Sequence, residues 1–250
     1  MTGLEYLNSI LVKYAVSPNL AESYRVAFLP LIQEWAGNLL VDLKISGSSR
    51  KSTAVSNGTD VDLFISLTST TQNTLNEIYE SLFAFLSKKS ITVRRQNVSI
   101  GVTYNGQLID LVPARRQGQF GNDHSLYVSK MNTWTKTNIE DHISTVSGSG
   151  RQDEFKILKI WRNQKSLDFP SFYLELVAID ALYGCTKGET DTNVMKVLKF
   201  IAQNIESRKY VDPANSNNTI SDQLTSAAKK VLASAADLSS KEQYWSGIVS

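Results

Sequence analysis

The sequence is poor in cysteine, in net charge and in long apolar runs. Its one cysteine, Cys185, excludes an internal disulfide framework and favours a reducing compartment. No stretch reaches the roughly 18 to 20 apolar residues of a membrane-spanning helix, and the first residues lack the basic and apolar segments of a secretory signal. The formal net charge of +2 indicates neither a nucleic-acid nor a membrane partner. We therefore expect a cytoplasmic protein without a membrane partner.

Histidine is scarce as well. His124 and His142, with one cysteine, cannot assemble a recognisable zinc site. Cys185 follows a predicted helix, and we expect it to act as a small apolar residue rather than as a nucleophile. These residue types therefore give no candidate site.

What the sequence does have is a globular composition with two kinds of hydrophobic pattern. Of its 250 residues, 42% are hydrophobic and 20% are charged, enough to bury a sizeable core. Strand patterns are confined to residues 40–113, and helical spacing precedes and follows them. We predict an α+β fold, with a small mixed-sheet lobe flanked by helices and a mainly helical C-terminal lobe. The expected domains are residues 1–125 and 126–250.

Apolar spacing and turn residues predict the individual elements. Asn105-Gly106 between two β-rich runs is typical of a tight hairpin, because both residues tolerate a positive φ. Asp153 is a candidate cap for the helix that follows it, and Pro170 opens the next one. The predicted helices are 4–16, 20–38, 74–89, 154–164, 172–184, 191–208 and about 221–237, the strands are 39–46, 61–67, 91–103 and 107–113, and the loops are 114–125 and 210–219.

Three aspartates stand in these apolar strands. Asp60 and Asp62 are two residues apart, so they project from the same face of a strand. Their neighbours Val61 and Leu63 are apolar, and a buried charge needs a partner or a metal. Asp110 lies in similar company on the returning strand of the hairpin. Such a trio suits Mg²⁺, with Mn²⁺ as an alternative, and two ions can stabilise both oxygens of a phosphoryl transfer.

Gly47 and Ser48 follow the strand that precedes the aspartates. Glycine lets the backbone approach a phosphate closely, and the amides of such a turn, with the serine hydroxyl, can point donors at an anion. An ordinary turn is the alternative when Gly-Ser is considered alone. Together with Asp60 and Asp62, the pair predicts a nucleoside triphosphate site.

At this point the sequence resembles a known superfamily. GSSRKSTAVSNGTDVDL is similar to the signature of the DNA polymerase β-type nucleotidyltransferases, in which Gly-Ser, Gly-Thr and Asp-x-Asp follow one another. Asp60 stands thirteen residues after Gly47, and Asp110 in LIDLVPA resembles the third acid, before a Val-Pro. The departure is Ser52, where the family usually has glycine before Thr53. The resemblance implies a nucleotidyltransferase fold with the three aspartates as catalytic metal ligands.

The later half carries the resemblance further. FKILKIWRNQ and PSFYLELVAIDALYG are similar to the second domain of oligoadenylate synthases, cGAS/DncV-like (CD-NTase) enzymes and archaeal-type CCA-adding enzymes, and YVDPANSNNT resembles their Asp-Pro-x-x-Pro-x-Asn-Asn segment. A lysine before the tryptophan contacts the triphosphate there, which implies this role for Lys159. Hydroxyls at the next helix start imply the same for Ser171 and Tyr173. From the residues alone, Lys159 could instead be solvated, and Trp161 is expected in the core.

The resemblance implies a template-independent nucleotidyltransferase that joins nucleoside triphosphates, such as ATP, and releases pyrophosphate. Within this class it favours a synthase of a cyclic or linear signalling oligonucleotide in antiviral defence. An RNA-terminal, CCA-adding-like transferase is the alternative, disfavoured because the chain ends soon after the Asn-rich segment. A catalytically silent nucleotide- or RNA-binding module is the third, disfavoured by the three acids. The basic pairs Arg94-Arg95 and Arg115-Arg116 are either solvent-exposed or contacts to phosphate or an RNA acceptor. An activating ligand and the oligomeric state stay open.

Overall fold

The chain folds into two compact units, and each unit is built from several separate stretches of the sequence. We call them the sheet unit and the helical unit. The sheet unit comprises residues 17–51 and 59–143, and the helical unit comprises residues 1–16, 52–58 and 144–250. The computed structural model describes residues 1–58, 60–89 and 91–250.

This division differs from the single boundary after residue 125 that the sequence predicted. The chain passes between the units several times, and the connector 52–58 belongs with the helical unit. The reason is packing: Leu7, Ile10 and Val55 are buried in the core of the helical unit, although they come early in the sequence. Hydrophobic side chains follow the core that covers them, whatever their place along the chain.

A mixed sheet of seven strands forms the sheet unit. Its order is β1-β2-β5-β4-β3, and β6 pairs with β5 and β7. Strands β2 and β5 are parallel, and the other neighbours are antiparallel. The elements of this unit are α2 (Leu20–Ala36), β1 (Leu40–Ile45), α3 (Gly47–Arg50), β2 (Val61–Leu67), α4 (Leu75–Ser87), β3 (Thr92–Arg95), β4 (Ile100–Tyr104), β5 (Gln107–Arg116), β6 (His124–Val128) and β7 (Thr133–Thr137).

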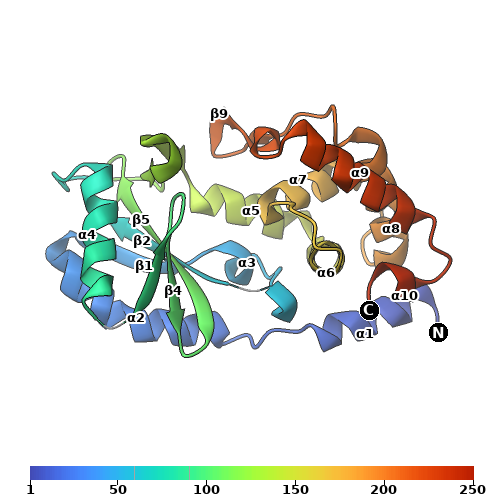
Figure 1. The fold of residues 1–250 in the computed structure, drawn as a ribbon, viewed down its shortest axis with the longest axis horizontal. Helices are drawn as coiled ribbons and strands as arrows, with labels where there is room; N and C mark the ends of the chain where they lie inside the picture. Colours follow the sequence, from blue (N-terminus) through green and yellow to red (C-terminus); the bar gives the residue numbers. More distant parts are fainter. Residues whose placement is uncertain (59, 90) are drawn as a thin grey trace. The chain divides into compact units, whose positions relative to one another are not determined.

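The two faces of the sheet have different neighbours. Val61, Leu63 and Ile65 of β2 lie in the main core with residues of α2 and α4, the two helices beside the strands in Figure 1. The alternate residues of a strand point to the opposite face. On that face Phe64 joins a smaller apolar cluster with Ile139. Asp62 shares this second face with Phe64, away from α2 and α4.

The predicted hairpin is confirmed. Asn105 and Gly106 have φ angles of 49° and 78°, and Tyr104 pairs with Gln107 directly across the turn. Two residues with positive φ match the right-handed twist of the strands that they join. The hairpin fixes the register of β5, and with it the position of Asp110.

The prediction of strands only between residues 40 and 113 is wrong. Residues 114–125 are not a simple loop, because β5 continues to Arg116 and β6 begins at His124. Burial alternates along β6, as expected of a strand with one covered face. The turn-forming residues between them occupy only the tip of this hairpin. Residues 210–219 likewise contain a small hairpin of β8 (Val211–Asp212) and β9 (Asn215–Thr219).

The helical unit is built around two buried helices, α6 (Gln152–Gln164) and α7 (Ser171–Ala181). Phe155, Trp161 and Leu174 are fully buried, which confirms the core position expected for Trp161. Asp153 is not the cap of α6: the residue before this helix is Arg151, and Asp153 lies in the first turn. The elements of this unit are α1 (Gly3–Lys13), α5 (Ile139–Ser149, which begins in the sheet unit), α6 (Gln152–Gln164), α7 (Ser171–Ala181), α8 (Thr190–Asn204), β8, β9, α9 (Ser226–Ser240) and α10 (Trp245–Ile248).

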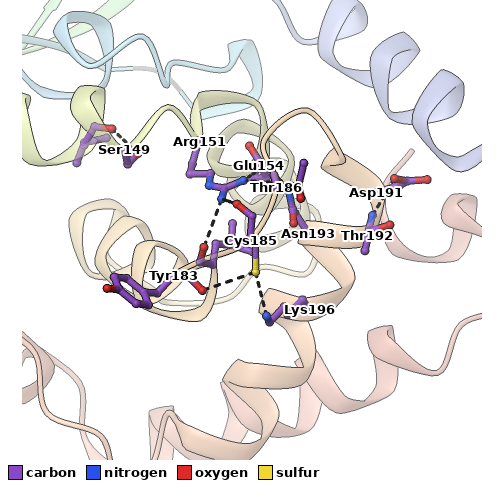
Figure 2. A network of polar contacts seen from close by, with 12 residues as sticks. Ser149, Arg151, Glu154, Tyr183, Cys185, Thr186, Asp191, Thr192, Asn193 and Lys196 are labelled. Atoms are coloured by element: carbon purple, nitrogen blue, oxygen red, sulfur yellow. Dashed lines mark hydrogen bonds and ion pairs between the residues drawn. The ribbon is translucent and has the colours of Figure 1, made fainter.

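A polar network fixes the segment between α7 and α8 (Figure 2). Arg151 donates hydrogen bonds to the carbonyl oxygens of Leu182, Cys185 and Thr186 and pairs with Glu154. A cation suits these positions because the last carbonyl groups of a helix lack partners of their own. The Cys185 thiol lies beside Lys196 Nζ at 2.9 Å, at the edge of this network. No helix in the described residues is long and apolar enough to cross a membrane.

Candidate functional site

A row of paired residues crosses the sheet. Asp62 of β2 is the direct partner of Asp110 of β5. Beyond Asp110, the row continues through Gly101 of β4 to Arg94 of β3. On the other side, the Ser46 amide donates to the Asp62 carbonyl oxygen at 2.9 Å. Directly paired residues point to the same face of a sheet. The row therefore brings together two of the predicted acids and one residue of a predicted basic pair.

Gly47 lies directly against the Asp62 side chain. It has a φ of +58°, and a Cβ atom built on it would stand 1.7 Å from Asp62 Oδ2. Both the backbone conformation and the close approach therefore require glycine. Gly47 and Ser48 begin the short helix α3. The sheet unit thus places the Gly-Ser segment beside Asp62, as the motif predicted, although the nucleotide-binding role of Gly47 and Ser48 stays a prediction.

Asp60 lies close enough to Asp110 for its charge to raise the pKa of that residue. Burial, and then the neighbouring charge of Asp60, raises the pKa of Asp110 above its usual range. Burial likewise raises the pKa of Asp60, and the positive charge of Arg94 opposes both shifts. A carboxylate that is half-buried beside another carboxylate is stabilised by an added cation. This part of the sheet therefore has the electrostatics of a cation site.

Gln96 orients the third acid, and the sequence prediction missed it. Its Nε2 donates to Asp110 Oδ1 at 3.0 Å, and the Ser99 hydroxyl donates to its Oε1 at 2.5 Å. The Gln96 carbonyl oxygen accepts hydrogen bonds from the hydroxyls of Tyr79 and Ser129, both at 2.8 Å. Gln96 is therefore held at both ends. It lies two residues after Arg94, so the strand period was the available signal.

Asp60, Asp62 and Asp110 are the predicted ligands of the Mg²⁺ ions. In the described part of the chain, no three His, Cys, Asp or Glu side chains converge as a ready metal site. The Asp62 carboxylate lies on Gly47, whereas the charge of Asp60 acts on Asp110. The donor set itself fits: all three groups are hard oxygen ligands, and two of them are like charges in need of a cation. Asp60, Asp62 and Asp110 are the residues that would hold such ions.

The conformation of Ser52 explains why the motif usually has glycine at this position. It has a φ of 61°, a conformation that costs a residue with a side chain about 1–2 kcal/mol and glycine almost nothing. Glycine, which the motif usually has here, would adopt it without this cost. Thr59, which belongs to the quoted motif, lies outside the described residues.

Lys159 is buried within the helical unit. Its Nζ lies 2.6 Å from Glu175 Oε1 and 2.6 Å from Thr53 Oγ1, and Glu175 is fully buried. The alternative of a solvated lysine is therefore wrong. The contact to triphosphate predicted for Lys159 stays a prediction, but much of its charge is balanced by Glu175. The signal for this pair was an acid inside the apolar run FYLELV.

Arg162, one turn after Lys159, differs from it. Its guanidinium donates to Ser171 Oγ at 2.9 Å and to the Phe169 carbonyl oxygen at 2.7 Å. It makes no direct ion pair with any residue that the structure describes. Burial lowers its pKa, and the negative charges of Glu175 and Asp168 oppose this shift. The guanidinium also donates to Asn163 Oδ1 at 2.9 and 3.0 Å, so hydrogen bonds and nearby carboxylates stabilise its charge within the helical unit. The sequence prediction had Ser171 but missed Arg162.

Tyr173, the remaining predicted contact, is fully buried. Its ring packs edge-on against Phe169, with centroids 5.1 Å apart, and it also contacts Tyr210. Its hydroxyl is buried without a hydrogen-bond partner among the described residues, and burial raises its pKa to about 12. Such an orphaned group is destabilising unless something supplies a partner. A nucleotide contact at Tyr173 stays a prediction.

The other basic side chains of the predicted pairs are already engaged. Arg95 pairs with Glu80 at 2.7 Å, Arg115 donates to the carbonyl oxygens of Thr71 and Asn73, and Arg116 donates to a serine of β2. These contacts are structural and support the interpretation that does not involve phosphate. Arg94 is the exception.

Comparisons with known proteins support the fold. No family model and no curated protein matches the sequence. The CD-NTase CdnG of Bradyrhizobium diazoefficiens, solved with GTP, matches with a TM-score of 0.78 and 14% identity, over 95% of this chain and 89% of that one. CdnC of E. coli MS115-1, solved with ATP, matches with a TM-score of 0.73 and 18% identity, over 94% and 89%. The chain has the nucleotidyltransferase fold.

A poly(U) polymerase shares this fold as well. Cid1 matches with a TM-score of 0.67 and 13% identity, over 96% of this chain and 95% of that one. The α+β fold class and the resemblance to CD-NTases and their superfamily, predicted mainly from Gly47 and the Asp60-x-Asp62 pair, are therefore confirmed for the fold. At such identities, a shared fold does not by itself establish activity.

Proposed function

We propose that this protein is a template-independent nucleotidyltransferase that uses nucleoside triphosphates and releases pyrophosphate. The observation that carries the proposal is the row on the sheet, where Gly47 lies against Asp62 and Asp62 is paired with Asp110. A phosphate-binding turn beside carboxylates on adjacent strands is what metal-assisted phosphoryl transfer requires. The charge of Asp60 disfavours ionisation of the half-buried Asp110, and a bound cation would offset this cost.

The residues divide the work as follows. Gly47 and Ser48 contact the β- and γ-phosphates, and Asp60, Asp62 and Asp110 hold divalent cations. Two Mg²⁺ ions, or Mn²⁺, would neutralise charge on the triphosphate and on the attacking oxygen when bound. Asp110 completes the place where the acceptor hydroxyl loses its proton. The new bond joins that oxygen to the α-phosphorus, and pyrophosphate leaves with the electrons of the broken bond.

In the helical unit, Ser171 and Tyr173 are proposed contacts to the nucleotide. Arg162 positions the first of them, because its guanidinium donates to Ser171 Oγ. Lys159 is a further proposed contact, although Glu175 already balances its charge.

For the product, we propose a cyclic or linear signalling oligonucleotide that serves antiviral defence in the cytoplasm. The support is the fold shared with CdnG and CdnC, which were solved with GTP and ATP. Addition of nucleotides to an RNA end is the second candidate, supported by the fold shared with the Cid1 poly(U) polymerase.

The test is incubation with the four nucleoside triphosphates and Mg²⁺, with and without RNA, followed by mass spectrometry and a pyrophosphate assay. Short oligonucleotides formed without RNA support the synthase, and label found only on RNA supports the second candidate. Asp60→Asn should abolish either product, whereas Asp153→Asn, on the surface of α6, should not. Absence of product and of pyrophosphate under all conditions, with nucleotide binding unchanged in Asp60→Asn, would leave a silent binding module.

A further inference from the structure

Arg94 is the cation in the row of paired residues that contains Asp62 and Asp110. Its side chain lies over Gly101, the residue that separates Arg94 from Asp110 in the register. A Cβ atom on Gly101 would stand 2.5 Å from Arg94 Nε and 2.8 Å from Gln96 Nε2. Any other residue there would displace both side chains. The bare backbone of Gly101 is therefore the surface along which Arg94 reaches toward the acids.

The neighbouring arginine shows that this orientation is specific. Arg95 points to the other face of β3, where it pairs with Glu80 and its guanidinium stacks on Phe83 with 3.6 Å to the ring centroid. Arg94 makes no ion pair within the described residues, and it is exposed. It is nevertheless close enough for its charge to act on Asp60 and Asp110. Its donors are thus available to a ligand at the site.

The order of residues along this row indicates which substrate lies near Arg94. Gly47 lies at the Asp62 end, and Arg94 lies at the opposite end, beyond Asp110. In an in-line phosphoryl transfer, the leaving and attacking groups are on opposite sides of the reacting phosphorus. If the leaving pyrophosphate occupies the Gly47 end, the attacking molecule enters from the Arg94 end.

We propose that Arg94 binds a phosphate group of the acceptor, so that the acceptor is a phosphorylated nucleotide or a nucleic-acid end rather than a neutral hydroxyl compound or a protein side chain. A guanidinium matches two oxygens of a phosphate at once, and such bonds are among the strong ones in proteins. The inference rests on the proposed function, because it assumes that the sheet site transfers nucleotides. It adds the residue that binds the phosphate of the second substrate.

The first experiment measures binding without turnover. The protein is saturated with α,β-methylene-ATP and Mg²⁺, and each of the four nucleoside 5′-monophosphates is then titrated by calorimetry, with the four nucleosides as unphosphorylated counterparts. Wild type should bind at least one monophosphate more tightly than its nucleoside, and Arg94→Ala should remove that preference. Loss of a charged hydrogen-bonded contact predicts a roughly ten- to hundredfold weaker affinity. Arg95→Ala is the matched control and should behave as wild type.

The second experiment measures turnover with the same pairs of acceptors. Arg94→Ala should raise KM for the phosphorylated acceptor, with little change for the nucleoside, and Arg94→Lys should restore part of the loss. Equal losses with both kinds of acceptor, or unchanged binding in Arg94→Ala, overturn the inference, as does a wild type that binds no monophosphate. Turnover without an effect of Arg94→Ala would leave the proposed function standing alone. Monophosphate binding that depends on Arg94 but gives no product would contradict only the proposed function.

Discussion

The two units of this molecule treat buried charge in opposite ways. In the helical unit, Lys159 pairs with Glu175 at 2.6 Å and Arg151 pairs with Glu154 at 3.3 Å, and all four side chains are buried. In the sheet unit, Asp60 and Asp110 are half-buried, and each shift in their pKa has the sign of an uncompensated charge. A buried charge with a partner is already compensated within the fold, whereas one without a partner favours a bound counter-ion. Burial of charge by itself therefore does not mark a functional site.

Gly47→Ala should have the largest effect, because it disturbs the acidic site of the sheet unit. The new Cβ atom would overlap Asp62 Oδ2, so the carboxylate must move. We expect pyrophosphate release to fall by about 10³-fold or more, as when a catalytic group is lost. Gly184→Ala, in the helical unit, is the matched control: Gly184 has a φ of +72° but no atom within 4 Å of the added Cβ. It should cost about 1–2 kcal/mol of unfolding free energy and leave activity intact.

Lys159→Met tests the helical side. Removal of one partner leaves the Glu175 carboxylate buried and uncompensated, so the free energy of unfolding should fall by about 3–5 kcal/mol. The double variant Lys159→Met/Glu175→Leu should recover most of this loss in chemical denaturation. If the double variant also binds ATP as wild type does, Lys159 has a structural role only. Stability regained with binding still lost would instead support its predicted contact to the triphosphate.

Gln96→Leu tests whether the Asp110 carboxylate has to be oriented by a hydrogen bond. The variant removes the donor to Asp110 Oδ1, a hydrogen bond to a charged group whose loss should reduce kcat roughly tenfold or more. Because the carboxylate would turn freely, the Mg²⁺ concentration for half-maximal activity should rise as well. Ser129→Ala removes a hydrogen bond to the same residue, but to its backbone carbonyl. If both variants lose activity equally, the effect is on folding of the loop and not on Asp110.

His124→Gln is expected to have the smallest effect, and on stability alone. Burial, helped by the charges of Arg116 and Lys44, lowers the pKa of His124 below its usual value of 6.5, and the ring accepts a hydrogen bond from Ser66 as a neutral group. The unfolded state therefore binds the proton more readily, so the wild type should lose stability as pH falls below 6.5. This part of the loss should be absent in the variant. Identical slopes of unfolding free energy against pH between about 5 and 7 would contradict it.

The local parts of the fold were predictable because their causes are local. The hairpin at Asn105-Gly106 follows from two residues that tolerate positive φ, and β2 follows from the apolar run of residues 61–67. The strand β6 was missed because glycines and polar residues at the tip of its hairpin outweigh five residues of alternation. Its pairing partner, β5, is what makes that short segment a strand.

The sequence by itself determined that Asp62 and Asp110 lie on apolar strands and that Gly47 follows a strand. Strand and turn geometry depend on residues that are close along the chain, so these positions could be predicted. Only the tertiary structure decided which charges are compensated. Glu175 contacts Lys159 from another helix, and Thr53 contacts both from the connector. Arg94 lies over Gly101, on a strand two positions from that of Asp110, and its charge acts on Asp60 and Asp110. Such contacts depend on packing between distant segments, since electrostatic free energy is set by distance and burial rather than by order along the chain.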